Sequence, residues 1–268
     1  MGLLKTNLDS LDFAKLYKEQ IENSTFKTKQ SDDWDKRADS LNKKVHNSIY
    51  TKEFIQKIDL DGVKSLLDVG CGPGTISLAL AKDLQEVYAL DYSKAMLECV
   101  TQNSKEQNIN NIKTIHKSWD DSWDDLPDVD IVVASRSMEV KDIKESLIKL
   151  NSKAKKRVYL TTKVGGTFID QEILNQLQRD IIPRPDYIYL VNVLHSMGIN
   201  AKVDFILSEY SKFQSDNADE FIQRIIWSLG EVSEQEKEIL KEYFNTKYKL
   251  KKQNDYMNWA FISWDVKQ

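Results

Sequence analysis

The chain has 268 residues, enough for one large domain or two small ones, and 41% of them are hydrophobic, enough for a sizeable core. Its 38 basic and 42 acidic side chains give a net charge of -4, which disfavours nucleic acid as a partner. Two cysteines cannot form a disulfide framework, and no apolar run approaches the roughly 20 residues of a membrane span. Because no signal peptide is evident, we expect a cytoplasmic location.

The first 60 residues predict helices and no strand. Apolar residues in LDFAKLYKEQI recur at helical spacing, and a second helix is expected in SDDWDKRADSLN, capped by Ser31 or Asp32. From residue 64, short β-rich runs alternate with helices, and five strands are predicted in SLLDVG, EVYALDY, NIKTIHK, DVDIVVAS and KRVYLTTKV. This alternation indicates a parallel sheet covered by helices on both faces.

Beyond Gly166 the alternation becomes less regular. Helices are predicted in QEILNQLQRDI and DYIYLVNVLHSMGI, and a sixth strand in AKVDFILSEY. A helical pair follows, whose second helix opens with a capping box of Ser233 and Glu236, and YMNWAFISWDVKQ predicts a final strand. The basic run KAKKR, residues 153–157, is expected to be a solvated connection before the fifth strand.

The segment LLDVGCGPGTISLAL, residues 66–80, places a glycine-rich turn between a strand and a helix. Such a turn offers backbone N–H groups and a helix N-terminus to a nucleotide-like ligand. The spacing is G-x-G-x-G, whereas dinucleotide-binding folds use G-x-G-x-x-G, and Thr75 occupies the position of the later glycine. Asp68, two residues before the turn, would repel a pyrophosphate, so it favours a ligand that carries a cation.

A second carboxylate, Asp91, ends the next predicted strand. It follows Gly74 by 17 residues, close to the ~20 at which an acid binds ribose hydroxyls in such folds. One carboxylate for an ammonium or sulfonium group and another for an unphosphorylated ribose together describe S-adenosylmethionine. That molecule has both groups and no phosphate.

The segments LLDVGCGPGTISLALAK, VYALDYSKAMLECV and NIKTIHKSWDDSWDDLPDVDIVVAS resemble the class I, Rossmann-like S-adenosylmethionine-dependent methyltransferases, particularly their small-molecule branch. The resemblance covers residues 64–165. It implies an α/β fold with a doubly wound, mostly parallel seven-stranded sheet, an antiparallel last strand, N-terminal helices and a helical lid. We therefore expect a single methyltransferase domain, 1–268. It divides into a helical N-terminal cap (1–60), a cofactor-binding core (61–170), and the rest of the sheet with helical insertions that form a substrate lid (171–268).

The resemblance also implies which residues bind the cofactor. Asp91 would bind both ribose hydroxyls, Tyr92 would pack on the adenine, and Ser135 would make a backbone contact along the sulfonium. The glycine turn would hold the methionine part, and its cofactor-binding residues would be Asp68, Gly70, Cys71, Gly72 and Gly74. The small side chain of Cys71 is expected to serve packing.

Further cofactor contacts are implied outside the turn. An adenine contact is expected after the third strand, from Ser118, Trp119 or Asp120. In the DDWDKRA segment, Trp34 would shield the site and attract the sulfonium, and Arg37 would pair with the cofactor carboxylate. No metal ligand is predicted.

The expected activity is methyl transfer to an unidentified small-molecule acceptor by in-line displacement. The fourth-strand segment lacks the Asn/Asp-Pro-Pro-Tyr tetrad of enzymes that methylate nucleic-acid bases. No general base is identified, although His116 and His195 have suitable chemistry. His116 is expected to be structural or solvated, and His195, in an apolar helix, is expected to be a packed, hydrogen-bonded core or interface residue. The alternatives are a non-catalytic S-adenosylmethionine-binding scaffold or regulatory protein and an NAD-dependent dehydrogenase, which Asp68 disfavours. A homodimer is left open, and no membrane partner is expected.

Overall fold

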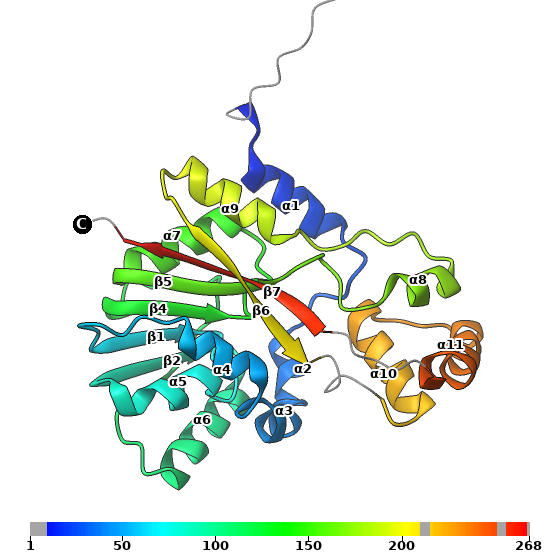
Figure 1. The fold of residues 1–268 in the computed structure, drawn as a ribbon, viewed down its shortest axis with the longest axis horizontal. Helices are drawn as coiled ribbons and strands as arrows, with labels where there is room; N and C mark the ends of the chain where they lie inside the picture. The colour runs from blue at the N-terminus through cyan, green and yellow to red at the C-terminus, as the bar shows by residue number, and fades with distance from the viewer. Residues whose placement is uncertain (1–9, 210–214, 251–255, 267–268) are drawn as a thin grey trace, which may run out of the picture.

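The computed structural model describes residues 10–209, 215–250 and 256–266. Its seven-stranded sheet has the order β3-β2-β1-β4-β5-β7-β6 (Figure 1). β1 to β5 pair in parallel, and β7 runs antiparallel to both of its neighbours, β5 and β6, so the predicted fold is confirmed. The strands are β1 (Ser65–Val69), β2 (Glu86–Asp91), β3 (Ile112–His116), β4 (Val129–Ser135), β5 (Ala154–Lys163), β6 (Lys202–Glu209) and β7 (Tyr256–Asp265).

Helices cover both faces of this sheet because alternate side chains of the central strands are apolar on both sides. Leu66 of β1 packs with Phe54 and Ile76 on one face, and its neighbour Leu67 packs with Leu147 and Leu190 on the other. The first face carries α4 (Ile49–Gln56), α5 (Thr75–Leu80) and α6 (Lys94–Glu106). The second carries α1 (Phe13–Asn23), α7 (Ile143–Lys153) and α9 (Tyr187–Ser196).

Three further helices build an apolar cluster of their own, separate from the two beside the sheet. They are α8 (Gln171–Leu177), α10 (Ala218–Leu229) and α11 (Glu234–Thr246), at the right of Figure 1. The predicted capping box of Ser233 and Glu236 opens α11. Glu236 also accepts a 2.7 Å hydrogen bond from Arg179, beyond α8, and this contact lowers the pKa of Glu236 to about 2. The carboxylate thus ties the chain after α8 to α11.

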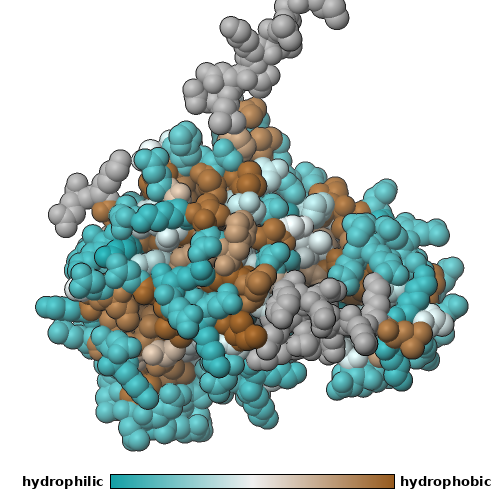
Figure 2. All heavy atoms as spheres, viewed as in Figure 1, coloured by the Kyte–Doolittle hydropathy of each residue, from teal (hydrophilic) through white to brown (hydrophobic). Residues whose placement is uncertain are grey.

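The outer edge of the sheet keeps apolar side chains at the surface. Figure 2 shows hydrophobic residues over β6 and α9 on the face in view. Val203, Phe205 and Leu207 alternate along β6 and are each about two-fifths exposed, and Ile188 of α9 is exposed nearby. Among the described residues, no helix is long and apolar enough to cross a bilayer.

Two local predictions are wrong. The expected cap at Ser31 or Asp32 is replaced by Gln30, whose N–H donates to Asp33 at 3.0 Å, and the single expected helix is two, α2 (Ser31–Asp35) and α3 (Ala38–Val45). The run KAKKR is not a connection, because β5 already begins at Ala154. Its Arg157 forms ion pairs with Asp59 and Asp265. These partners are distant in the sequence, so the run of basic residues does not reveal them.

Candidate active site

The glycine turn joins the end of β1 to α5. Gly70 and Gly72 adopt positive φ angles of 66° and 54°, which side chains rarely tolerate. A Cβ at Gly70 would collide with the Cβ of Ser137, so the chain after β4 lies directly on the turn, whereas a Cβ at Gly72 would meet open space. Glycine at 70 therefore permits close packing within the protein, and glycine at 72 leaves room for a ligand.

The N–H groups of this turn bond within the protein, so the expectation that they face a ligand is wrong. Gly70 and Cys71 both donate to the Leu90 carbonyl, at 2.8 and 3.0 Å, Gly72 donates to the Asp91 carboxylate at 2.8 Å, and Gly74 donates to the Cys71 carbonyl at 3.1 Å. A pyrophosphate would find none of these four donors free. The Cys71 side chain packs against Ala89, Leu97 and Val100, as its small size suggested.

Asp68 is buried beneath the turn with one carboxylate oxygen bonded and one without a partner in the described structure. The bonded oxygen accepts from the N–H and hydroxyl of Ser77, at 3.1 and 2.6 Å. Burial, with a smaller contribution from the charge of Asp91, raises the pKa of Asp68 to about 6. A buried carboxylate with an unmatched oxygen favours a cationic or hydrogen-donating ligand.

Asp91 ends β2 beside the turn and is only 6% exposed. Its oxygens accept from the N–H groups of Gly72, at 2.8 Å, and Ser93, at 2.9 Å, while burial raises its pKa. Ser93 caps α6 as expected and also donates to Asp35 of α2 at 2.5 Å. Asp35, which the sequence did not single out, therefore fixes α2 at the end of β2.

This attachment brings the predicted aromatic shield, Trp34, to α6, where it packs against Met96 and Cys99. Trp34, on α2, meets Trp227 of α10 edge to face, with ring centres 5.4 Å apart. The guanidinium of Arg37 lies 4.3 Å from the centre of the Trp227 ring. Tyr92 donates to the Lys29 carbonyl at 3.4 Å, and burial raises the pKa of Tyr92 to about 12. Residues from the N-terminal and the C-terminal parts of the chain thus meet at this site.

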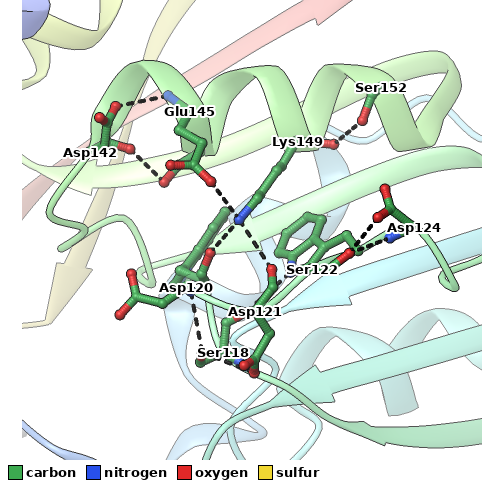
Figure 3. A network of polar contacts seen from close by, with 12 residues as sticks. Ser118, Asp120, Asp121, Ser122, Asp124, Asp142, Glu145, Lys149 and Ser152 are labelled. Carbon is green, nitrogen blue, oxygen red and sulfur yellow. Dashed lines mark hydrogen bonds and ion pairs between the residues drawn. The ribbon is translucent and has the colours of Figure 1, made fainter.

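The segment after β3 forms a turn that α7 holds in place (Figure 3). The Ser118 hydroxyl donates to Asp121 at 3.0 Å, and the Lys149 ammonium donates to the Trp119 carbonyl at 2.7 Å. Asp120 is exposed, and its N–H donates to Ser118. The polar atoms of Ser118 are therefore engaged within its own turn.

At the end of β4, a tyrosine that the sequence did not single out connects three elements. The Tyr50 hydroxyl, from α4, bonds the hydroxyls of Ser135, at 2.8 Å, and Thr161 on β5, at 2.5 Å. The next residue, Arg136, has a positive φ of 59°, and its N–H donates to Thr161 at 3.0 Å. The Ser135 side chain is thus held by Tyr50.

Helix α1 also holds this segment. The Tyr17 hydroxyl lies 3.2 Å from the Met138 carbonyl and 3.1 Å from the Val140 carbonyl, to which it donates. The two histidines with suitable chemistry lie elsewhere: His116, at the end of β3, bonds the Tyr92 carbonyl at 3.1 Å, and His195 is exposed on α9. A core position for His195 is therefore wrong, and its place in an interface stays a prediction.

Known proteins match both the sequence and the fold. The family described as "Methyltransferase domain" matches residues 66–157. An uncharacterized protein of Haemophilus influenzae is 36% identical over 260 residues, 96% of this chain and 97% of that protein. The ribosomal protein L11 methyltransferase of Campylobacter lari is 35% identical over 139 residues, 50% of this chain and 43% of that protein. The chain belongs to the class I S-adenosylmethionine-dependent methyltransferases.

The fold of this methyltransferase agrees with that assignment. The solved structure of YcgJ from Bacillus subtilis aligns with a TM-score of 0.55 and 17% identity, over 82% of this chain and 98% of that one. S-adenosylmethionine is the cofactor of the family. The site fits it, because the unpartnered oxygen of buried Asp68 suits a cationic group, while the occupied N–H groups of the turn do not suit a pyrophosphate.

Proposed function

We propose that this methyltransferase transfers a methyl group to a small-molecule acceptor by in-line displacement. The observation that carries the proposal is the pair of buried carboxylates, Asp68 and Asp91, beside a glycine turn with no free N–H at Gly70, Cys71, Gly72 or Gly74. S-adenosylmethionine supplies a methyl group on a sulfonium, whose departure leaves a neutral thioether. The chain has then to align the acceptor and exclude water.

We assign the core cofactor contacts to the turn and the end of β2. Asp68 would accept from the ammonium group, and Asp91 would accept from both ribose hydroxyls. The open space at Gly72 would admit the ligand next to the backbone. Tyr92, directly after Asp91, would pack on the adenine. Gly70, Cys71 and Gly74 would contribute by shaping the turn.

The outer contacts come from α2, α10 and two strand ends. Trp34 would shield the cofactor, supported by its packing on Trp227. Arg37 would bind the cofactor carboxylate, and it has no ion pair among the described residues. Ser135 would contribute backbone along the sulfonium. The adenine contact after β3 remains assigned to one of three residues, Ser118, Trp119 and Asp120.

The helical cluster of α8, α10 and α11 is proposed as the substrate lid. Its apolar core is separate from those beside the sheet, and Trp227 brings α10 to the shielding residue Trp34. This supports the expected division into a helical cap (1–60), a cofactor-binding core (61–170) and the remaining sheet with its lid (171–268). The homodimer stays open, and the cytoplasmic location stays a prediction.

Calorimetric titration with S-adenosylmethionine, S-adenosylhomocysteine and NAD tests the cofactor assignment. We expect both sulfur ligands to bind and NAD not to bind, since NAD carries a pyrophosphate. Incubation with methyl-labelled S-adenosylmethionine and a metabolite extract tests the acceptor class, and label should appear in small molecules. Tight NAD binding without affinity for S-adenosylmethionine would contradict the cofactor assignment, whereas label found only in protein or RNA would contradict the acceptor class.

A further inference from the structure

We infer that the pocket beside Arg136 binds an anionic group of the methyl acceptor, a carboxylate or a phosphate. This inference rests on the proposed function, because it identifies the pocket as the acceptor side of a methyl-transfer site. The pocket opens where β4, β5 and β7 meet α1 and the chain after β5. Its polar lining includes Arg136, Lys163, Arg184 and Glu139.

Arg136 is held in a conformation that arginine seldom adopts. Its φ of 59° lies in the left-handed region, which is sterically unfavourable for a residue with a side chain. The hydrogen bond from its N–H to Thr161 fixes this backbone, and Tyr50 in turn bonds Thr161. The guanidinium then lies 4.2 Å from the centre of the Tyr50 ring and 5.9 Å from that of Trp259. The fold thus orients the Arg136 guanidinium against the aromatic rings of Tyr50 and Trp259.

The pocket contains more positive charge than its own acids neutralise. Arg184 is paired with Glu139 at 3.4 Å and also donates to backbone carbonyls. Among the described residues, neither Arg136 nor Lys163 has a carboxylate within 4.0 Å, and burial lowers the pKa of Lys163. Asp186 acts on Lys163 only at longer range. The Lys163 ammonium donates to the Val164 carbonyl at 2.7 Å, and Arg136 stacks on Tyr50, but neither has a carboxylate partner among the described residues. Partly buried cations without a carboxylate partner are suited to an anionic ligand.

The dimensions of the pocket suit the end of a ligand rather than a whole metabolite. It encloses about 40 Å³, room for roughly three water molecules. A carboxylate or phosphate occupies similar space. Phe168, Trp259 and Met138 supply apolar walls. A ligand that carries an anion on an apolar or planar body would therefore meet the cations with its charge and these walls with its body.

This pocket lies next to the glycine turn but has the opposite charge. Ser137, directly after Arg136, lies against Gly70. The charge of Arg136 lowers the pKa of Tyr50 and the charge of Asp68 raises it, so both charges lie near the same hydroxyl. The acidic turn attracts the cationic methyl donor, and the basic pocket attracts the anionic acceptor. Charge alone would therefore assign each reactant to its own side and orient the acceptor.

Binding of simple probes to the protein saturated with S-adenosylhomocysteine tests the inference without turnover. Benzoate and phenyl phosphate supply the two anions on the same ring, and benzamide and benzylamine are the neutral and cationic controls. We expect at least one anion to bind about tenfold or more tightly than either control, as a charge-assisted hydrogen bond would give. The tighter anion distinguishes a carboxylate acceptor from a phosphate acceptor.

Variants locate the bound anion. Arg136→Gln and Lys163→Met should each weaken binding of the preferred anion about tenfold or more, while Lys155→Met, an exposed lysine at the other end of β5, should leave it unchanged. Thermal melts verify folding, and if one variant does not fold, the other carries the test. Affinity for S-adenosylhomocysteine should stay within about twofold of the wild type.

Any one of four outcomes would overturn the inference. The first three are equal binding of benzamide and the anions, no binding of either anion at about 10 mM, and unchanged anion binding in both variants. A loss of S-adenosylhomocysteine affinity in Arg136→Gln with no effect on the anion would assign the guanidinium to the cofactor instead, which also overturns it. Failure of the wild type to bind S-adenosylmethionine at all would contradict the proposed function, a result distinct from these.

Discussion

The backbone N–H of Gly72 donates to a carboxylate oxygen of Asp91 across 2.8 Å, so the glycine turn and the end of β2 are held together. The other oxygen accepts from the N–H of Ser93 at 2.9 Å. The carboxylate is therefore oriented before a ligand arrives, and a ligand that binds it loses little affinity to ordering that side chain.

Replacing Asp91 with asparagine should weaken cofactor binding. The amide group keeps the size of the side chain but presents a donor toward either the Gly72 or the Ser93 N–H, and it removes an acceptor for ribose. We expect the Kd for S-adenosylmethionine, measured by calorimetry, to rise about tenfold or more. Asp83→Asn, an exposed change on the turn before β2, is the matched control and should bind normally. Equal affinity in the two variants would contradict the role of Asp91.

Cofactor affinity should fall below neutral pH because Asp68 loses its charge. With a pKa of about 6, the carboxylate is mostly ionised at pH 7.5 and mostly protonated at pH 5.5, so binding of a cation should weaken about fourfold across that range. Calorimetry at several pH values measures this. Asp68→Asn should bind more weakly at pH 7.5 and lose most of the pH dependence, which separates Asp68 from titration of the ligand. A variant that keeps the full dependence would exclude Asp68 as its source.

The same carboxylate should destabilise the protein when no cofactor is bound. The pKa of Asp68 is raised from 3.8 to about 6 on folding, so the folded state holds the extra proton between these values. Its contribution to stability is then fully present below pH 4 and is lost as the pH rises through 6. In urea unfolding without ligand at pH 7.5, Asp68→Asn should increase the free energy of unfolding by on the order of 1–3 kcal/mol. The difference from wild type should shrink toward pH 4, and a constant destabilisation at every pH would refute the prediction.

The contact of Trp34 with Trp227 should couple α2 to α10 in cofactor binding. Trp34→Ala and Trp227→Ala should each weaken S-adenosylmethionine binding, and the double variant should lose less than the sum. The coupling energy from calorimetric Kd values should be about 0.5–1.5 kcal/mol, as for other aromatic pairs. Strict additivity would mean that the two rings act separately.

The parts that the sequence predicted well depend on local pattern. Leu66 and Leu67 make β1 apolar on both faces, so a buried parallel sheet was predicted directly, and the position of Asp91 at the end of β2 brought it to the turn. Gln30 shows the limit of this approach. Gln30, Ser31 and Asp32 are all polar, and the sequence does not show which of them meets the unpaired backbone N–H groups at the start of the helix, so the N-cap was assigned to the wrong residue.

The sequence alone could not predict the contacts between distant segments. No sequence pattern singled out Tyr50, yet it bonds Ser135 and Thr161, which are 85 and 111 residues away. The role of Arg136 could not be predicted either, because its left-handed backbone depends on the Thr161 hydroxyl, 25 residues away. Likewise, the N–H groups of Gly70, Cys71 and Gly72 bond to residues of β2, which spacing alone cannot show.

The hydrogen bonds of Tyr17 and Tyr50 have a consequence for protein engineering. The family match spans residues 66–157, but these two tyrosines precede it, and Thr161 and Trp259 follow it. Excised on its own, that segment would keep the glycine turn and lose every support of Ser135 and Arg136 named here. The segment of this enzyme that matches the family is therefore not a transferable module, and a graft that carries its activity would have to include both flanking segments.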